Sequence, residues 1–171
     1  MYTLKLTAAI ITTLCLTSVA AFGFTPLTAT IRVSSGNLYD YVVIGEHLKA
    51  TDGFDNAYDT ISPGNLNASM GQPFISVIIP HPDWQPAARE LRGDIRAVAK
   101  MQEWQLAISS SLPKGTPLTV AIQTEGTTLP HGVKLTIKDA SKETDLKADK
   151  YSILAAGPGE TIRMIISVEQ P

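Results

Sequence analysis

Three aspartates lie within eight positions of the segment LKATDGFDNAYDTISPG, residues 48–64. Hard cations such as calcium prefer several carboxylate and carbonyl oxygens, so Asp52, Asp55 and Asp59 could bind one with carbonyls near Gly53. The spacing lacks the alternation and the terminal glutamate of an EF-hand loop. A second interpretation is that Asp52 and Asp55 accept hydrogen bonds from nearby backbone N–H groups and hold a turn. We expect mainly loop architecture, with a calcium site at the three aspartates and catalytic carboxylates as alternatives.

The other residues that could take part in catalysis do not form the sequence pattern of a catalytic site. His47, His81 and His131 are scattered and lack the helical spacing of a zinc-binding pair. No serine occupies a G-x-S-x-G elbow with an evident partner. The RGD triplet at residues 92–94 is a short match that a salt bridge in a loop explains. We therefore expect no enzymatic activity, no catalytic residues and no cofactor apart from the calcium alternative.

Two tryptophans could offer flat rings to a sugar. Trp104 alternates with Leu106 and Ile108, which predicts that it packs in the core. Trp84 lies between two prolines and is expected to be the exposed ring.

The chain begins with the pattern of a secretory signal peptide. Lys5 supplies a positive charge, and the apolar stretch LTAAIITTLCLTSVAAF follows it. Small residues then allow cleavage after Ala20, Ala21 or Gly23. No later stretch approaches the roughly 20 apolar residues that a membrane-spanning helix needs. We expect residues 1–23 to be a cleaved signal and residues 24–171 to be a single exported domain.

The amino-acid composition further restricts the kind of protein and the kind of partner. The one cysteine, Cys15, lies in the expected signal, so the mature chain would have no disulfide, no thiolate nucleophile and no cysteine-rich zinc site. Small secreted domains of eukaryotes usually depend on disulfides, so this pattern favours a bacterial protein. The net charge of −2 and the lack of a basic patch argue against nucleic acid as a partner.

Alternation of apolar and polar residues dominates the rest of the chain. It recurs in EWQLAIS, PLTVAIQ, VKLTIK and TIRMIISV, separated by turn formers such as SSGN, SPGN, LPKG and GPGE. Such short strands predict an all-β, antiparallel immunoglobulin-like or fibronectin-III-like sandwich of about eight strands. Residues 83–100 fit a short helix or a strand around DIRAV equally well. We expect the core to contain Trp104, Leu118, Val120, Ile122, Val133, Leu135, Ile137 and Ile166.

The order of several motifs also resembles a known family. The motifs are YVVIGEHLKATDGFDNAYD, LRGDIRA, EWQLAIS, PLTVAI, LPHGVKLTIKD and KYSILAAGPGETIRMIISV. Together they resemble the immunoglobulin-like or fibronectin-III-like modules that end many large secreted bacterial proteins, including type IX sorting-like modules. The resemblance implies a β-sandwich fold.

These observations favour an exported, non-catalytic β-sandwich that docks onto an extracellular protein, a glycan or the cell envelope. The alternative is a structural subunit of an extracellular filament or surface layer. In that case FTPLTATIRV, residues 24–33, would add as a strand to the sheet edge of a neighbouring copy. Either protein would be extracellular, cell-surface associated or periplasmic.

Overall fold

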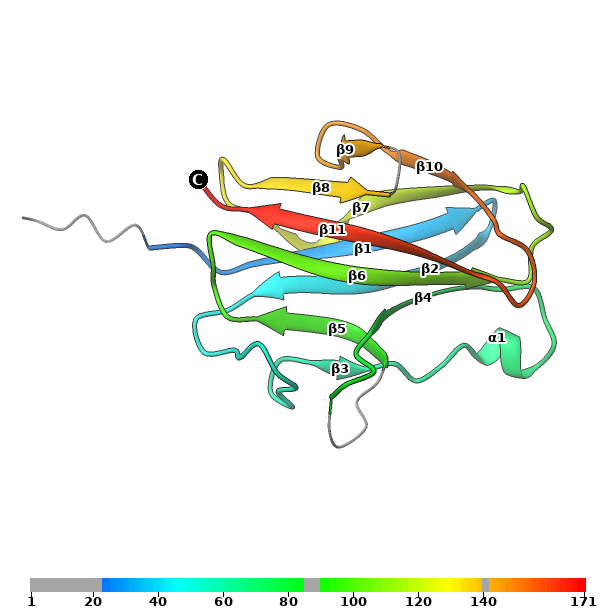
Figure 1. Cartoon of the computed structure of the whole chain (residues 1–171), viewed down its shortest axis with the longest axis horizontal. Coiled ribbons are helices and arrows are strands. Elements are labelled where there is room, and N and C mark those ends of the chain that lie inside the picture. Colours follow the sequence, from blue (N-terminus) through cyan, green and yellow to red (C-terminus); the bar gives the residue numbers. More distant parts are fainter. Residues whose placement is uncertain (1–22, 85–89, 140–141) are drawn as a thin grey trace, which may run out of the picture.

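A computed structural model describes residues 23–84, 90–139 and 142–171, so most of the expected signal peptide lies outside the described residues. The described chain is all-β, with eleven strands and one short helix (Figure 1). In chain order the elements are β1 (Leu27–Ser35), β2 (Leu38–Glu46), β3 (Thr60–Ile61), α1 (Leu66–Ser69), β4 (Ile75–Pro80), β5 (Glu90–Arg96), β6 (Met101–Ser110), β7 (Pro117–Thr128), β8 (Lys134–Lys138), β9 (Glu143–Asp145), β10 (Tyr151–Leu154) and β11 (Thr161–Glu169).

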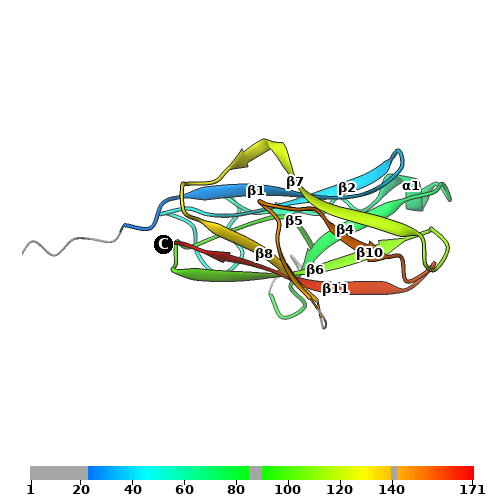
Figure 2. The same ribbon diagram turned by 90° about the horizontal axis from the view of Figure 1, so that it is seen from above.

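The strands form one connected sheet in the order β10-β7-β1-β2-β5-β4-β6-β11-β8-β9, with β3 paired to β5. The sheet curls into two facing layers and nearly closes into a barrel (Figure 2). Strand β4 makes the corner, because residues 75–78 pair with β6 and residues 79–80 pair with β5. On the opposite side, the Tyr151 hydroxyl donates a hydrogen bond of 2.5 Å to the Asp139 carboxylate, which links β10 to the end of β8.

The expected all-β class is confirmed, but the described chain forms a nearly closed, 11-stranded sheet where a sandwich of about eight antiparallel strands was expected. Strands β3, β9 and β10 are only two to four residues long, too short to produce clear alternation in the sequence. One neighbouring pair, β2 with β5, is parallel rather than antiparallel. The chain crosses from β2 to β5 through residues 47–89, a long connection of the kind that parallel pairing requires.

The core lies between the two layers and follows the predicted alternation. Seven of the eight predicted core residues are buried, all except Ile122, which is half-buried and packs against the core. Trp104 is fully buried, as predicted. The tight link from β1 to β2 uses Gly36 at φ 55°, a backbone angle that glycine adopts without steric cost.

The helical interpretation of residues 83–100 is wrong for the part that forms β5. Strand β5 pairs with β2, β3 and β4, so its backbone groups bond across strands rather than along a helix. Gly93 of β5 lies where an added Cβ would come within 3.3 Å of Thr60. The single described helix is α1, which begins after Asn65, whose side chain accepts a hydrogen bond from the Ala68 N–H. None of the described helical structure has the length and apolar character needed to cross a membrane.

Strand β1, the segment considered for strand exchange, lies inside the sheet. It pairs along its length with β2 and on its other side with β7. Both of its edges are therefore used within the same chain. The ends of the strand order are β9 and β10, of three and four residues, and edges this short offer little template for another strand.

Candidate functional site

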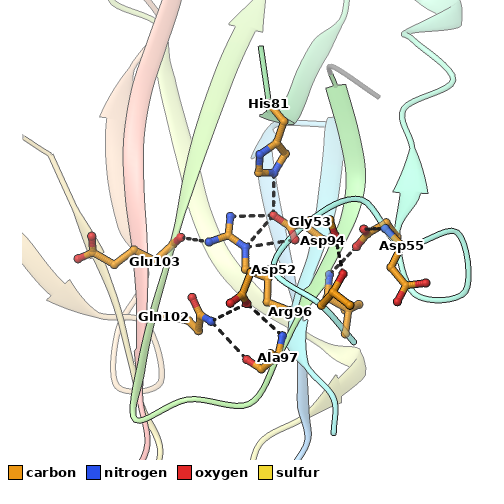
Figure 3. A network of polar contacts seen from close by, with 12 residues as sticks. Asp52, Gly53, Asp55, His81, Asp94, Arg96, Ala97, Gln102 and Glu103 are labelled. Carbon is orange, nitrogen blue, oxygen red and sulfur yellow. Dashed lines mark hydrogen bonds and ion pairs between the residues drawn. The ribbon is translucent and has the colours of Figure 1, made fainter. Parts of the chain in front are cut away.

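A buried carboxylate, Asp94 of β5, joins three parts of the chain (Figure 3). Its side chain is 1% exposed and lies 2.9 Å from Nε2 of His81, just after β4. Arg96 donates to the same carboxylate from Nη2 at 2.9 Å and from Nε at 3.2 Å. Arg96 also donates from Nη1 to the Glu103 carbonyl of β6 at 2.8 Å. The Asp94 carboxylate thus holds the His81 imidazole and the Arg96 guanidinium, and Arg96 links β5 to β6.

Charge on Asp94 is favoured despite its burial. Burial alone would raise the pKa of this carboxyl group, because it disfavours the ionised form. Hydrogen bonds from His81 and Arg96, together with the positive charge of Arg96, outweigh burial and lower the pKa of Asp94 below its ordinary value. The carboxylate therefore remains ionised at neutral pH and neutralises the guanidinium beside it.

The turn His81-Pro82-Asp83-Trp84 places two rings against each other. The backbone N–H of Trp84 donates a hydrogen bond to the His81 carbonyl at 3.3 Å, and proline favours the second position of such a turn. The imidazole and indole rings stack with centroids 3.7 Å apart and planes 16° apart. The ring of Phe54 lies 6.4 Å from the indole centroid. Trp84 is consequently half-buried, whereas the sequence predicts an exposed ring.

These rings border a pocket of about 400 Å³ on the outer side of β6 and β11. Ligand pockets in proteins typically have volumes of about 300–1,000 Å³. The floor comes from the strands, where Gln105 of β6 pairs with Ile165 of β11. The lining combines apolar surface, carboxylates, an amide and a guanidinium; it consists of Pro80, His81, Pro82, Asp83, Trp84, Arg96, Glu103, Gln105 and Ile165.

The pocket continues sideways across the sheet. A second hollow of about 260 Å³ shares Gln105 and Ile165 with the first and extends over Arg163 toward Lys138 at the end of β8. Because they share these two lining residues, the two hollows lie next to each other on this face of the sheet.

The three aspartates found in the sequence bind backbone groups near this site. Asp52 Oδ1 accepts from the Ala97 N–H and from Gln102 Nε2, both at 3.3 Å. Asp55 Oδ1 accepts from the Ala57 N–H at 3.0 Å, closing a local turn. The structure thus gives Asp52 and Asp55 the backbone bonds that the architectural interpretation expects.

Asp59 holds the same loop against β5. Its Oδ2 accepts from the Asp55 N–H at 2.7 Å and its Oδ1 accepts from the Ile95 N–H at 3.0 Å. Burial raises the pKa of Asp59, and the charge of Asp94 adds to that effect, although the two backbone bonds act against it. Within the described ranges, no three His, Cys, Asp or Glu side chains are arranged to hold a metal ion.

The RGD triplet forms part of a strand rather than an adhesive loop. It lies within β5, where Arg92 Nη1 donates to Asp40 Oδ1 at 2.5 Å and Asp94 makes the contacts described above. The predicted salt bridge exists, but in a strand. The importance of Asp94 and Arg96 was missed at the level of sequence. The one available signal was the placement of Arg92, Asp94 and Arg96 at every second position of a strand candidate.

A second buried polar cluster joins the two ends of the domain and was also missed. Glu46 is 1% exposed and accepts hydrogen bonds from Gln170 Nε2 at 2.5 Å and from the Ala99 N–H at 3.1 Å. The Gln170 side chain also bonds the backbone of Thr25 on both its N–H and its carbonyl. Burial raises the pKa of Glu46, although these hydrogen bonds oppose the rise.

The rings and polar groups of the pocket can take part in stacking and in hydrogen bonding. Its described lining contains no serine, threonine or cysteine, and its carboxylates belong to Asp83 and Glu103. The other two histidines lie elsewhere: the centroids of the His47 and Tyr58 rings are 4.6 Å apart with the rings tilted, and His131 is exposed. No family model matches the chain, and no curated protein or solved structure matches it either.

Proposed function

We propose that the chain is an exported, non-catalytic binding module that docks onto an extracellular protein, a glycan or the cell envelope. The observation that carries the proposal is the pocket beside Trp84, whose wall is held by a buried ionic network. Burying a carboxylate costs several kcal/mol of desolvation, which its partners must offset. Side chains locked in this way lose little conformational entropy when a ligand binds, which favours recognition.

The fold supports a modular role of this kind. We propose that the nearly closed barrel is a variant of the immunoglobulin-like or fibronectin-III-like sandwich, as the resemblance to secreted bacterial modules implies. Support comes from the two facing layers and from β4, which pairs with β5 at one end and with β6 at the other. Strands that switch between layers are a known way to build the corner of a sandwich.

The filament alternative has less support. Donating residues 24–33 to a neighbouring copy would remove β1 from its two present partners, β2 and β7. Self-association would then require opening the middle of the sheet. Size-exclusion chromatography of the processed chain is expected to give a monomer, and a concentration-dependent series of larger species would favour the filament subunit.

Co-sedimentation tests the binding proposal. The processed chain would be mixed with insoluble polysaccharides and with envelope fractions of bacterial cells, and the pelleted protein would be measured. We expect specific pelleting with at least one material, without release of soluble sugar or peptide. Pelleting no greater than that of an unrelated protein of similar size across all materials would refute the proposal. Release of soluble products would instead reveal an enzyme.

A further inference from the structure

The pocket beside Trp84 has a lining that selects among ligand classes. Its apolar surface includes Trp84 and Ile165, and its hydrogen-bonding groups include Asp83, Glu103 and Gln105. A pyranose ring presents the same mixture, with C–H groups on its faces and hydroxyls around its rim. Hydroxyls both donate and accept, so they can pair with carboxylate acceptors and with an amide that does both.

The charges of the pocket disfavour an anionic ligand. Arg96 is the only guanidinium or ammonium group in the described lining, and Asp94 already neutralises it through three hydrogen bonds. Asp83 and Glu103 add two carboxylates, and the Glu103 side chain accepts a hydrogen bond from a neutral hydroxyl, that of Ser167. A phosphate, sulfate or uronate beside Trp84 would meet net negative charge, whereas a neutral ligand would not. The second hollow differs, because its lining contains Arg163 and Lys138 as well as Asp139.

The wall of the pocket is fixed before any ligand arrives. The indole of Trp84 stacks on His81, and Asp94 holds His81 through Nε2. An aromatic ring held in one orientation can receive the apolar face of a sugar with little loss of side-chain freedom. The second hollow, which shares Gln105 and Ile165, provides room for the neighbouring sugar of a chain.

From these features we infer that the pocket beside Trp84 binds a neutral oligosaccharide, with one sugar against Trp84 and the next one over Ile165. This inference rests on the proposed function and names the ligand class of the same site. It makes Trp84 and Gln105 the main determinants of affinity. It also predicts that affinity rises with chain length, because a longer ligand occupies both hollows.

Isothermal titration calorimetry of the processed chain tests the inference. The probes are cellohexaose, chitohexaose, laminarihexaose and mannohexaose, together with their disaccharides, a polygalacturonate oligomer and choline. We expect at least one neutral hexaose to bind, its disaccharide to bind several-fold more weakly, and polygalacturonate and choline to show no heat. Tighter binding of polygalacturonate or choline than of every neutral sugar would overturn the ligand class.

Three variants locate the site. Trp84→Ala should weaken binding of the chosen hexaose about tenfold or more, which corresponds to about 1.4 kcal/mol or more. Gln105→Ala alters an exposed strand position and should weaken binding several-fold while leaving the fold intact. The matched control is Tyr39→Ala, which removes another exposed aromatic ring, from β2, and should change nothing. Circular dichroism checks that each variant is folded.

The outcomes distinguish the inference about a neutral oligosaccharide from the proposed function as a binding module. If the wild-type chain pellets with an envelope material but binds no neutral hexaose, or if both pocket variants bind like wild type, this inference is wrong while the binding module stands. If the wild-type chain binds neither the materials nor the sugars, both are wrong.

Discussion

Neutralising Asp94 should destabilise the protein far more than neutralising a surface carboxylate. In Asp94→Asn, the half-buried guanidinium of Arg96 loses its counter-charge, while the shape of the side chain is preserved. Breaking a buried ion pair from one side costs about 3–5 kcal/mol. Arg96 retains 17% side-chain exposure and its bond to the Glu103 carbonyl, so the expected loss lies at the lower end, about 3 kcal/mol.

A matched control comes from the ion pair of Lys134 with Glu143. These groups are 3.8 Å apart, with side chains 55% and 51% exposed. Exposed pairs contribute about 0–1 kcal/mol, so Glu143→Gln should change stability by less than about 1 kcal/mol. Urea denaturation at pH 7, monitored by circular dichroism, gives the free energy of unfolding for both variants by linear extrapolation.

The pH dependence of stability provides an independent check that the charge on Asp94 stabilises the fold. The folded pKa of Asp94 lies below its ordinary value of 3.8, so its contribution to stability is fully present above that value. It is lost as the pH falls through the folded pKa, where the wild-type carboxylate becomes protonated. The difference between wild type and Asp94→Asn should therefore be constant near neutrality and shrink in strong acid. A loss at pH 7 no larger than that of Glu143→Gln would refute the ionic network.

Three further predictions concern other parts of the molecule. Leu135→Ala should cost roughly 2–5 kcal/mol, because Leu135 is fully buried and its removal leaves a cavity; an unchanged urea midpoint would count against this. Burial raises the pKa of Glu46 above 4.5, so its carboxyl group adds stability below pH 4.5 that is lost as the pH rises through the folded pKa. Denaturation from pH 4 to pH 8 should show this loss in wild type and not in Glu46→Gln, and identical profiles would contradict it. Asp59→Ala should cost about 1 kcal/mol for each of its two backbone bonds, and millimolar calcium should leave the melting temperature of wild type unchanged. A calcium-dependent, chelator-reversible rise in melting temperature would instead identify Asp52, Asp55 and Asp59 as a metal site.

Much of the fold was predictable because alternation reports burial directly. Strands such as β6 and β8 show one apolar face in the sequence, and Trp104 and Leu135 are buried as expected. Alternation does not report which strands become neighbours. The parallel pairing of β2 with β5 and the two partners of β4 depend on contacts between segments far apart in the chain.

The candidate site was less predictable for a related reason. The turn His81-Pro82-Asp83-Trp84 has a recognisable composition, and it explains why two rings three positions apart can meet. The buried carboxylate of Asp94, however, is stabilised by His81 from a different segment and by Arg96 two residues away. A charged residue in a short strand gives no local sign that such partners will surround it. The aspartates with the most conspicuous spacing proved to bind backbone groups.

The most direct test of the binding site uses the two tryptophans of the chain as reporters. In a two-dimensional spectrum of the ¹⁵N-labelled protein, each indole N–H gives one cross-peak, and Trp84→Phe identifies the peak of Trp84. Titration with the neutral hexaose should shift the Trp84 peak and leave the peak of fully buried Trp104 in place. Saturating binding that leaves the Trp84 peak unmoved would contradict a ligand site at this pocket.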